Sequence, residues 1–202
     1  MAVETEAPAE EHATSLGIDN RKLAMWAFLG SECMFFGALI ATYLLFHTHL
    51  NNGPGPRDVY NIPYTSVSSF VLLMSSLTMV LALAAIQRSD ERGLRVWLLA
   101  TAFLGMTFIG GQVYEFTEFF KEGLTIKTSP FGSAFFMLTG FHGAHVTIGI
   151  LMLLSLFQLS RMGKIPPSDS LKVELVGLYW HFVDVVWIVI FTVVYLIPAA
   201  KK

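Results

Sequence analysis

Residues 59–87 read VYNIPYTSVSSFVLLMSSLTMVLALAAIQ, a stretch without Asp, Glu, Lys or Arg. A transmembrane helix needs about 20 predominantly apolar residues, so this stretch is long enough to cross a bilayer. Its apolar residues form continuous runs, whereas a strand of a membrane β-barrel alternates apolar and polar positions. The stretch therefore predicts a membrane-spanning helix near residues 66–87.

Four further segments have the same character. Residues 96–114 and 128–160 also contain no Asp, Glu, Lys or Arg. Glu32 is the only such residue within 23–56, and Asp184 is the only one within 175–200. We therefore predict an all-α membrane protein, a bundle of five transmembrane helices near residues 23–47, 66–87, 95–120, 131–160 and 172–197.

The composition favours a membrane protein and excludes several other classes. The chain has 202 residues, of which 54% are hydrophobic and 14% charged, whereas soluble domains average roughly 25% charged. Together with a net charge of -2, this excludes a disordered chain, a nucleic-acid-binding protein and an ordinary soluble enzyme. Cys33 is the single cysteine, so an internal disulfide and a cysteine zinc site are excluded as well.

The distribution of Lys and Arg predicts the orientation of the bundle. If the N-terminus lies inside, the inner segments hold eight of these residues and the outer segments hold five. Positive residues concentrate on the cytoplasmic side of membrane proteins. We therefore expect the N-terminus inside and the C-terminus outside.

The first 20 residues differ from the rest of the chain. They contain five acidic residues and no Lys or Arg, a composition typical of disordered segments. We therefore divide the chain into an acidic, disordered N-terminal tail (1–20) and a five-helix transmembrane domain (21–202). The turn-forming cluster NNGPGPR at 51–57 predicts a loop after the first helix.

Several ionisable residues lie inside the predicted helices, where such groups are energetically expensive. Glu32 stands alone among apolar neighbours, and we expect its carboxyl to favour the neutral form unless a partner stabilises the charge. The others occur in pairs three residues apart, which share a helix face. These pairs are Glu115 with Glu118, His142 with His145, and His181 with Asp184.

Three hypotheses for these residues remain open. The first is a metal centre, although carboxylate-bridged sites in helix bundles use a Glu-x-x-His pair that does not occur here. The second is a proton or ion pathway, although Glu32 and Glu115 lie toward opposite membrane faces. The third, which we favour, is structural, with these side chains forming hydrogen bonds between helices. The candidate residues are Glu32, Glu115, His142, His145, His181 and Asp184.

Four stretches resemble a single family. They are SECMFFGALIATYLLF (31–46), GQVYEF (111–116), GSAFFMLTGFHGAHVTIG (132–149) and YWHFVDVVWIVIFTVVYL (179–196). Together they resemble subunit III of the haem–copper oxidases, the cytochrome c and quinol oxidase subunit III family, over residues 22–198. All six candidate residues lie within these stretches.

The resemblance implies a non-redox integral membrane subunit of a proton-pumping terminal oxidase of aerobic respiration. In that family subunit III has no catalytic residue, metal or cofactor, and haem and copper are bound by partner subunits. The expected partners are subunit I in direct contact, subunit II, small subunits, membrane lipids, and cytochrome c or quinol as electron donor, with no nucleic acid. The candidate residues are then structural or related to proton uptake, and the chain lies in a bacterial cytoplasmic (inner) membrane.

The predicted helix number departs from part of that family. Longer members have seven helices, whereas five are predicted here, as in short bacterial forms. Whether another subunit supplies two further helices is open. The alternatives for the function are subunit III of a quinol oxidase, a homologue associated with nitric oxide reductase, and a free-standing membrane enzyme or carrier. The last would need its own cofactor or a continuous polar path.

Overall fold

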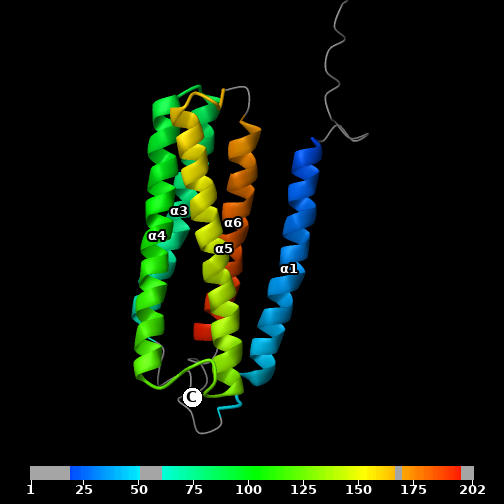
Figure 1. Ribbon diagram of the computed structural model, residues 1–202, viewed down its shortest axis with the longest axis vertical. Helices are drawn as coiled ribbons and strands as arrows, with labels where there is room; N and C mark the ends of the chain where they lie inside the picture. The colour runs from blue at the N-terminus through cyan, green and yellow to red at the C-terminus, as the bar shows by residue number, and fades with distance from the viewer. Residues whose placement is uncertain (1–18, 51–60, 167–169, 197–202) are drawn as a thin grey trace, which may run out of the picture.

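Five long helices make up most of the structure (Figure 1). The computed structural model describes residues 19–50, 61–166 and 170–196. The helices are α1 (Asn20–Phe46), α3 (Ile62–Gln87), α4 (Glu91–Lys121), α5 (Pro130–Arg161) and α6 (Leu171–Phe191), and α6 continues as the π-helical turn η2 (Thr192–Leu196). Each helix is long and apolar enough to cross a membrane. The predicted all-α, five-helix membrane fold is therefore confirmed.

Helices α3 and α4 each begin four residues earlier than predicted, and a polar side chain caps each of them. α3 begins at Ile62, where the side chain of Asn61 accepts a hydrogen bond from the Tyr64 N–H. α4 begins at Glu91, where the side chain of Asp90 accepts one from the Gly93 N–H. Such caps satisfy the free N–H groups of a first helical turn. A search for apolar residues misses the first turn of α4 because that turn contains Glu91 and Arg92.

Two predicted segments fall largely outside the described residues. The predicted N-terminal tail covers 1–20, and the structure describes only its last two residues, Asp19 and Asn20. Asn20 already belongs to α1, and the side chain of Asp19 caps that helix by accepting from the Arg21 N–H. The predicted loop at 51–57 lies wholly outside the described residues.

Successive helices run in opposite directions, and α1 stands at the edge of the bundle (Figure 1). Helices α3 to α6 pack against one another, with the most extensive contact between α3 and α4, whereas α1 packs on α5 and α6. A turn of three residues joins α3 to α4, and its Ser89 has a φ of 60°. A residue with a Cβ atom adopts this left-handed conformation at some energetic cost, which Gly does not pay.

A tryptophan on α6 fills the centre of the bundle. The Trp180 side chain is completely buried, and glycines on two neighbouring helices make room for it. A Cβ atom at Gly105 of α4 would stand 2.6 Å from the Trp180 ring, and one at Gly149 of α5 would stand 2.7 Å from it. The two glycines therefore let α4 and α5 approach the indole ring of Trp180 closely.

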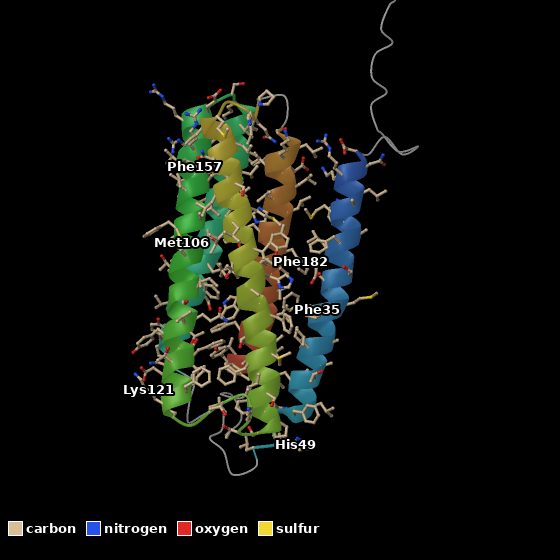
Figure 2. All side chains as sticks on the ribbon, in the orientation of Figure 1. Phe35, His49, Met106, Lys121, Phe157 and Phe182 are labelled. Atoms are coloured by element: carbon tan, nitrogen blue, oxygen red, sulfur yellow. The ribbon has the colours of Figure 1, made fainter. Side chains whose placement is uncertain are left out.

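Large apolar side chains also cover the outside of the bundle (Figure 2). Phe70, Phe103 and Leu151 are each at least half exposed, and Met106 projects from the outer side of α4. In water such a surface would aggregate. In a bilayer it contacts lipid or other membrane helices, as expected for a transmembrane bundle.

Candidate functional site

The six candidate residues do not gather in a single site. They lie in four places along the interfaces between helices, and each place joins different helices. Glu32 of α1 meets His145 of α5, and Glu115 of α4 meets α3 and η2. His142 lies among aromatic rings, and His181 and Asp184 of α6 face α3. The structure therefore contains several small polar contacts in an otherwise apolar interior.

Glu32 has a partner 113 positions later in the chain. Its Oε2 atom lies 3.2 Å from Nε2 of His145. The other ring nitrogen, Nδ1, lies 2.8 Å from the Phe141 carbonyl oxygen, so Nδ1 carries a hydrogen and donates it. A hydrogen bond between Nε2 and Oε2 therefore needs one proton between them, carried either by the Glu32 carboxyl or by Nε2 of His145.

Further polar contacts hold α1 against the bundle on either side of Glu32. Near the start of α1, Lys22 forms an ion pair with Glu174 of α6. Near its end, the Tyr43 hydroxyl donates to the Val194 carbonyl at 3.4 Å. α1 is therefore joined to its neighbours at three levels along its length.

Glu115 is buried between three elements. The Thr65 hydroxyl of α3 donates to its Oε1 atom, and the Tyr195 hydroxyl of η2 donates to its Oε2 atom at 3.4 Å. Glu118, predicted to share a face with Glu115, is instead half-buried and pairs with Lys121 on its own helix at 2.7 Å. Residues three apart are about 60° apart around a helix, which is enough to separate the bundle interior from its edge.

His142 is completely buried among aromatic rings. Its ring stacks on Trp187, with centroids 4.9 Å apart and planes 26° apart, and it meets the edges of Phe36 and Phe108. Neither ring nitrogen of His142 has a hydrogen-bond partner among the described residues. His145 is three residues away and shares the Phe36 ring as a neighbour, but it lies beside Glu32, whereas His142 stacks on Trp187.

His181 and Asp184 lie at the interface of α6 with α3. The Nδ1 atom of His181 is 2.6 Å from the Ser76 hydroxyl oxygen. Asp184 is buried, with 3% of its surface exposed. Ser76 is also close to the Asp184 carboxyl, yet neither carboxyl oxygen has a hydrogen-bond partner of normal geometry within the described residues.

The sequence analysis did not identify the hydroxyl groups of α3 that form hydrogen bonds with side chains of α4 and α6. Thr65, Ser69 and Ser76 are spaced by four and seven residues, so they lie on one face of α3. They occur in the charge-free stretch that decides the fold. That regular spacing was a usable signal, because an apolar helix with a line of hydroxyl groups on one face offers hydrogen bonds to a neighbour.

The described residues do not assemble the ligands that the metal-centre hypothesis requires. Among residues 19–50, 61–166 and 170–196, no three His, Cys, Asp or Glu side chains are close enough to hold a metal ion together.

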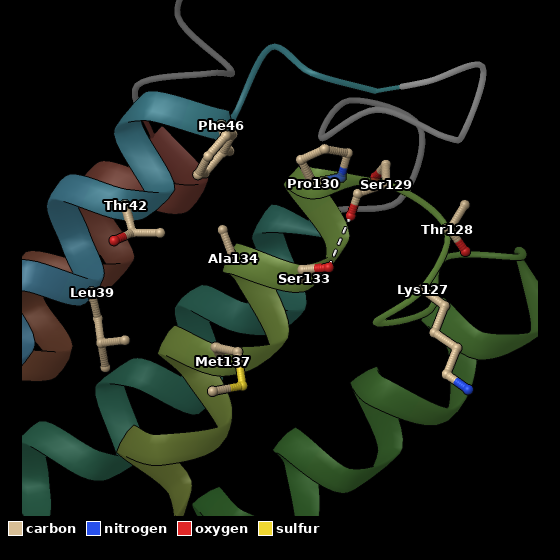
Figure 3. A pocket seen from close by; sticks show the side chains of 10 residues that line it. All are labelled: Leu39, Thr42, Phe46, Lys127, Thr128, Ser129, Pro130, Ser133, Ala134 and Met137. Atoms are coloured by element: carbon tan, nitrogen blue, oxygen red, sulfur yellow. Dashed lines mark hydrogen bonds between the residues drawn. The ribbon is translucent and has the colours of Figure 1, made fainter.

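A groove lies between the end of α1 and the start of α5 (Figure 3). Its volume is about 610 Å³, and its walls include Leu39 and Phe46 of α1 and Ala134 and Met137 of α5. The hydroxyl of Ser133 in this groove is within hydrogen-bond distance of the carbonyl oxygens of Ile126 and Ser129, which precede α5. The loop residues Lys127, Thr128 and Ser129 line one end of the groove. Between α1 and α5 its lining is mainly apolar and can accept an apolar chain.

The comparisons with known proteins identify the family. A family model described as cytochrome c oxidase subunit III matches residues 2–198. This chain belongs to the cytochrome c oxidase subunit III family. It is 39% identical to cytochrome c oxidase subunit 3 of Bacillus sp. (strain PS3), a match that covers 97% of this chain and 95% of the relative.

Other members of the subunit III family are named for a different electron donor. The chain is 40% identical to quinol oxidase subunit 3 of Bacillus spizizenii, over 86% of this chain and 85% of the relative. It is 35% identical to cytochrome bo(3) ubiquinol oxidase subunit 3 of Pseudomonas aeruginosa, over 94% and 90%.

The family and the five spans together confirm the main prediction. The chain is subunit III of a haem–copper oxidase, a complex that is an oxidoreductase, and it is a multi-pass protein of a bacterial cytoplasmic membrane.

Proposed function

We propose that this chain is a subunit III without a redox centre of its own, which packs directly on subunit I of a proton-pumping cytochrome c oxidase and stabilises the complex. Haem and copper are bound by partner subunits. The observation that carries this proposal is that several candidate side chains form polar contacts between helices. Glu32 with His145, Glu115 with Thr65 and Tyr195, and His181 with Ser76 each join two or more helices.

The same contacts support a structural assignment of four of the six residues. A catalytic group must leave an atom available for substrate or cofactor. Glu32, Glu115, His145 and His181 instead contact neighbouring helices inside the bundle. Hydrogen bonds of this kind contribute about 0.6 to 1.7 kcal/mol each in membrane proteins.

The exposed surface of α1 supports the proposed contact with other subunits. Only 11% of the most apolar window of α1 is buried, whereas for the last helix the value is 44%. Gly30 and Gly37 lie on one face of α1, and a Cβ atom at either would meet nothing within 4 Å. Small residues on a helix face allow another helix to approach closely.

Membrane lipids are further proposed partners. Most of the groove lies between the membrane-spanning helices α1 and α5, and Lys127, Thr128 and Ser129 of the preceding loop line its end. Acyl chains are the surrounding solvent of such helices. Lipid contact with this face would complete the packing of α1 at the edge of the bundle.

Support of proton uptake by subunit I is the second part of the proposal. The Glu32–His145 pair holds one exchangeable proton inside the membrane-spanning region. We propose that this pair acts on proton uptake through the position of α1, rather than as a conducting path through this chain. Glu32 and Glu115 belong to separate contacts with different partners.

Quinol is the alternative electron donor. Relatives named for quinol oxidases are as similar to this chain as the relative named for cytochrome c oxidase. A homologue associated with nitric oxide reductase and a free-standing enzyme or carrier find no support among these relatives.

Purification of the tagged chain from native membranes in mild detergent tests the proposal. The haem spectrum and the iron and copper contents are measured in the eluate, before and after the partner subunits are stripped away. We expect haem and copper to co-elute and then to leave with a larger subunit. A dinuclear copper centre in the eluate would identify cytochrome c as donor, and its absence would favour quinol. Iron or copper retained by the isolated chain would contradict the proposal.

A further inference from the structure

Asp184 lies between two tryptophans that both bind α3. Trp180 donates its indole N–H to the Ser75 hydroxyl at 2.9 Å, and Trp187 donates to the Ser69 hydroxyl at 2.9 Å. Positions 180, 184 and 187 are spaced by four and three residues, so they share one face of α6. The buried carboxyl of Asp184 therefore faces α3 between the two tryptophan contacts.

The donors around Asp184 are already used. The two indole N–H groups bind Ser75 and Ser69, and these serines donate their own hydrogens to the carbonyl oxygens of Leu72 and Thr65. Ser76 remains as the hydroxyl close to the carboxyl, and it already contacts the imidazole of His181.

Ser76 alone cannot satisfy Asp184. If Nδ1 of His181 is unprotonated, the single hydroxyl hydrogen of Ser76 is donated to it. If Nδ1 carries a hydrogen, Ser76 accepts that bond and can donate to one oxygen of Asp184. In either case at least one of the two carboxyl oxygens has no donor among the described residues. This agrees with the structure, in which neither oxygen has a hydrogen-bond partner within the described residues. Buried polar groups in this position are normally satisfied by ordered water.

We propose that an ordered water molecule binds between α3 and α6, held by the carboxyl of Asp184 and the hydroxyl of Ser76. The site offers the two or more polar partners that a buried water requires. With this water in place, Asp184, the water, Ser76 and His181 form one hydrogen-bonded chain. Because His181 is only half-buried, the chain leads from a carboxyl in the interior toward the surface of the subunit.

The surroundings of His142 show why the proposal is limited to Asp184. Its ring nitrogens also lack a partner among the described residues, but its neighbours are the rings of Phe36, Phe108 and Trp187. The one N–H among these rings belongs to Trp187, and it already binds Ser69. A water beside His142 would therefore have too few polar partners, and the proposal concerns the Asp184 site alone.

The first test is a structure of the whole wild-type oxidase complex at a resolution that shows water. We expect a density peak within about 3 Å of both the Asp184 carboxyl and the Ser76 hydroxyl. A carboxyl bonded only to protein groups, with no density beside it, would overturn the proposal. This readout needs no variant, so it does not depend on the folding of one.

The second test measures proton exchange by infrared spectroscopy after the complex is transferred to D2O. The Asp184 signal is identified as the difference between wild type and Asp184→Asn. We expect Ser76→Ala to slow its exchange by about tenfold or more, because one link of the chain is missing. Ser66→Ala is the matched control, since the exposed Ser66 hydroxyl binds only the Ile62 carbonyl of its own helix. Equal exchange rates in Ser76→Ala and wild type would overturn the proposed chain.

Discussion

The contact between Glu32 and His145 makes each side chain dependent on the other. His145 is fixed in orientation by the Phe141 carbonyl, and its imidazole is the partner of Glu32 within the described part of the chain. Removal of either residue leaves a polar group in a low-dielectric interior, and the loss then exceeds the net contribution of the bond itself. The pair is therefore best measured by a double-mutant cycle, which separates the interaction from these losses.

We expect Glu32→Ala and His145→Ala to show a coupling free energy of about 0.6 to 1.7 kcal/mol, the range for hydrogen bonds between membrane helices. The measurement is the SDS-induced unfolding of the purified complex for the two single variants and the double variant. The ion pair of the half-buried Glu118 with the exposed Lys121, both on α4, is the matched control and is expected to give a smaller coupling. Equal couplings in the two cycles would contradict an anchoring role for Glu32.

His181→Ala and Asp184→Ala are expected to weaken retention of this subunit more than they change initial turnover. His181→Ala removes a polar contact of about 1 kcal/mol between α6 and α3, and Asp184→Ala removes the buried carboxyl beside it. Both changes loosen the helix packing on which the contact of this subunit with its partners depends. The measurements are subunit content after detergent washing and oxygen consumption in the first turnovers. Val185→Ala, at an exposed position of the same helix, is the control. Immediate loss of turnover with the subunit still bound would contradict this prediction.

The sequence identified the important polar residues but not their partners. An isolated carboxyl in an apolar helix is visible as soon as the sequence is read, so Glu32 could be selected. Its partner His145 could not, because pairing between distant helices depends on how they rotate against each other. The separation of Glu115 from Glu118 has the same origin, since a small rotation of α4 decides which carboxyl enters the bundle.

At the scale of the helix, glycine positions decide how closely α4 and α5 approach α6. Gly105 and Gly149 contact the two sides of Trp180, whereas Gly140 of α5 faces open space. All three occur in apolar helices and look equivalent in the sequence. The number of helices followed directly from the charge-free segments, but the role of each glycine depends on the tertiary contact.

Gly149→Ala is expected to destabilise the subunit by about 1 to 3 kcal/mol, because the added methyl group overlaps the Trp180 ring. Gly140→Ala on the same helix is the control. It is expected to be neutral or to stabilise by up to about 1 kcal/mol, because Ala has the higher helix propensity and nothing blocks the methyl group. Thermal unfolding of the purified complex measures both. If Gly140→Ala were as unstable as Gly149→Ala, the loss of stability would come from helix propensity or from contact with another subunit, and not from overlap with Trp180.

At the scale of the whole molecule, the alternating helices place the basic residues unequally. The start of α1, the turn between α3 and α4, the end of α5 and the start of α6 lie at one end of the bundle (Figure 1). This end holds the described Arg and Lys residues Arg21, Lys22, Arg88, Arg92, Arg95, Arg161, Lys164 and Lys172. Lys121 and Lys127 lie at the other end. The predicted orientation depends on this difference and on no single residue.

We expect the more basic end of the bundle to face the cytoplasm, with the C-terminus outside. A C-terminal fusion to an enzyme that is active only outside the cytoplasm should be active, and a C-terminal fluorescent protein that folds only in the cytoplasm should be dark. The same reporters placed at the turn beside Ser89 should give the opposite results. Activity of the outside reporter at Ser89 would reverse the proposed topology.

The attachment of α1 also has a consequence for biogenesis. α1 leaves the ribosome first, but its partner helices α5 and α6 are the last to be made. At roughly 5–20 residues per second, synthesis of the intervening segment lasts on the order of ten seconds. Through that interval Glu32 is in the membrane without His145, and a lone carboxyl in lipid is expensive. The nascent chain therefore depends on the insertion machinery to shelter α1 until the fourth span arrives.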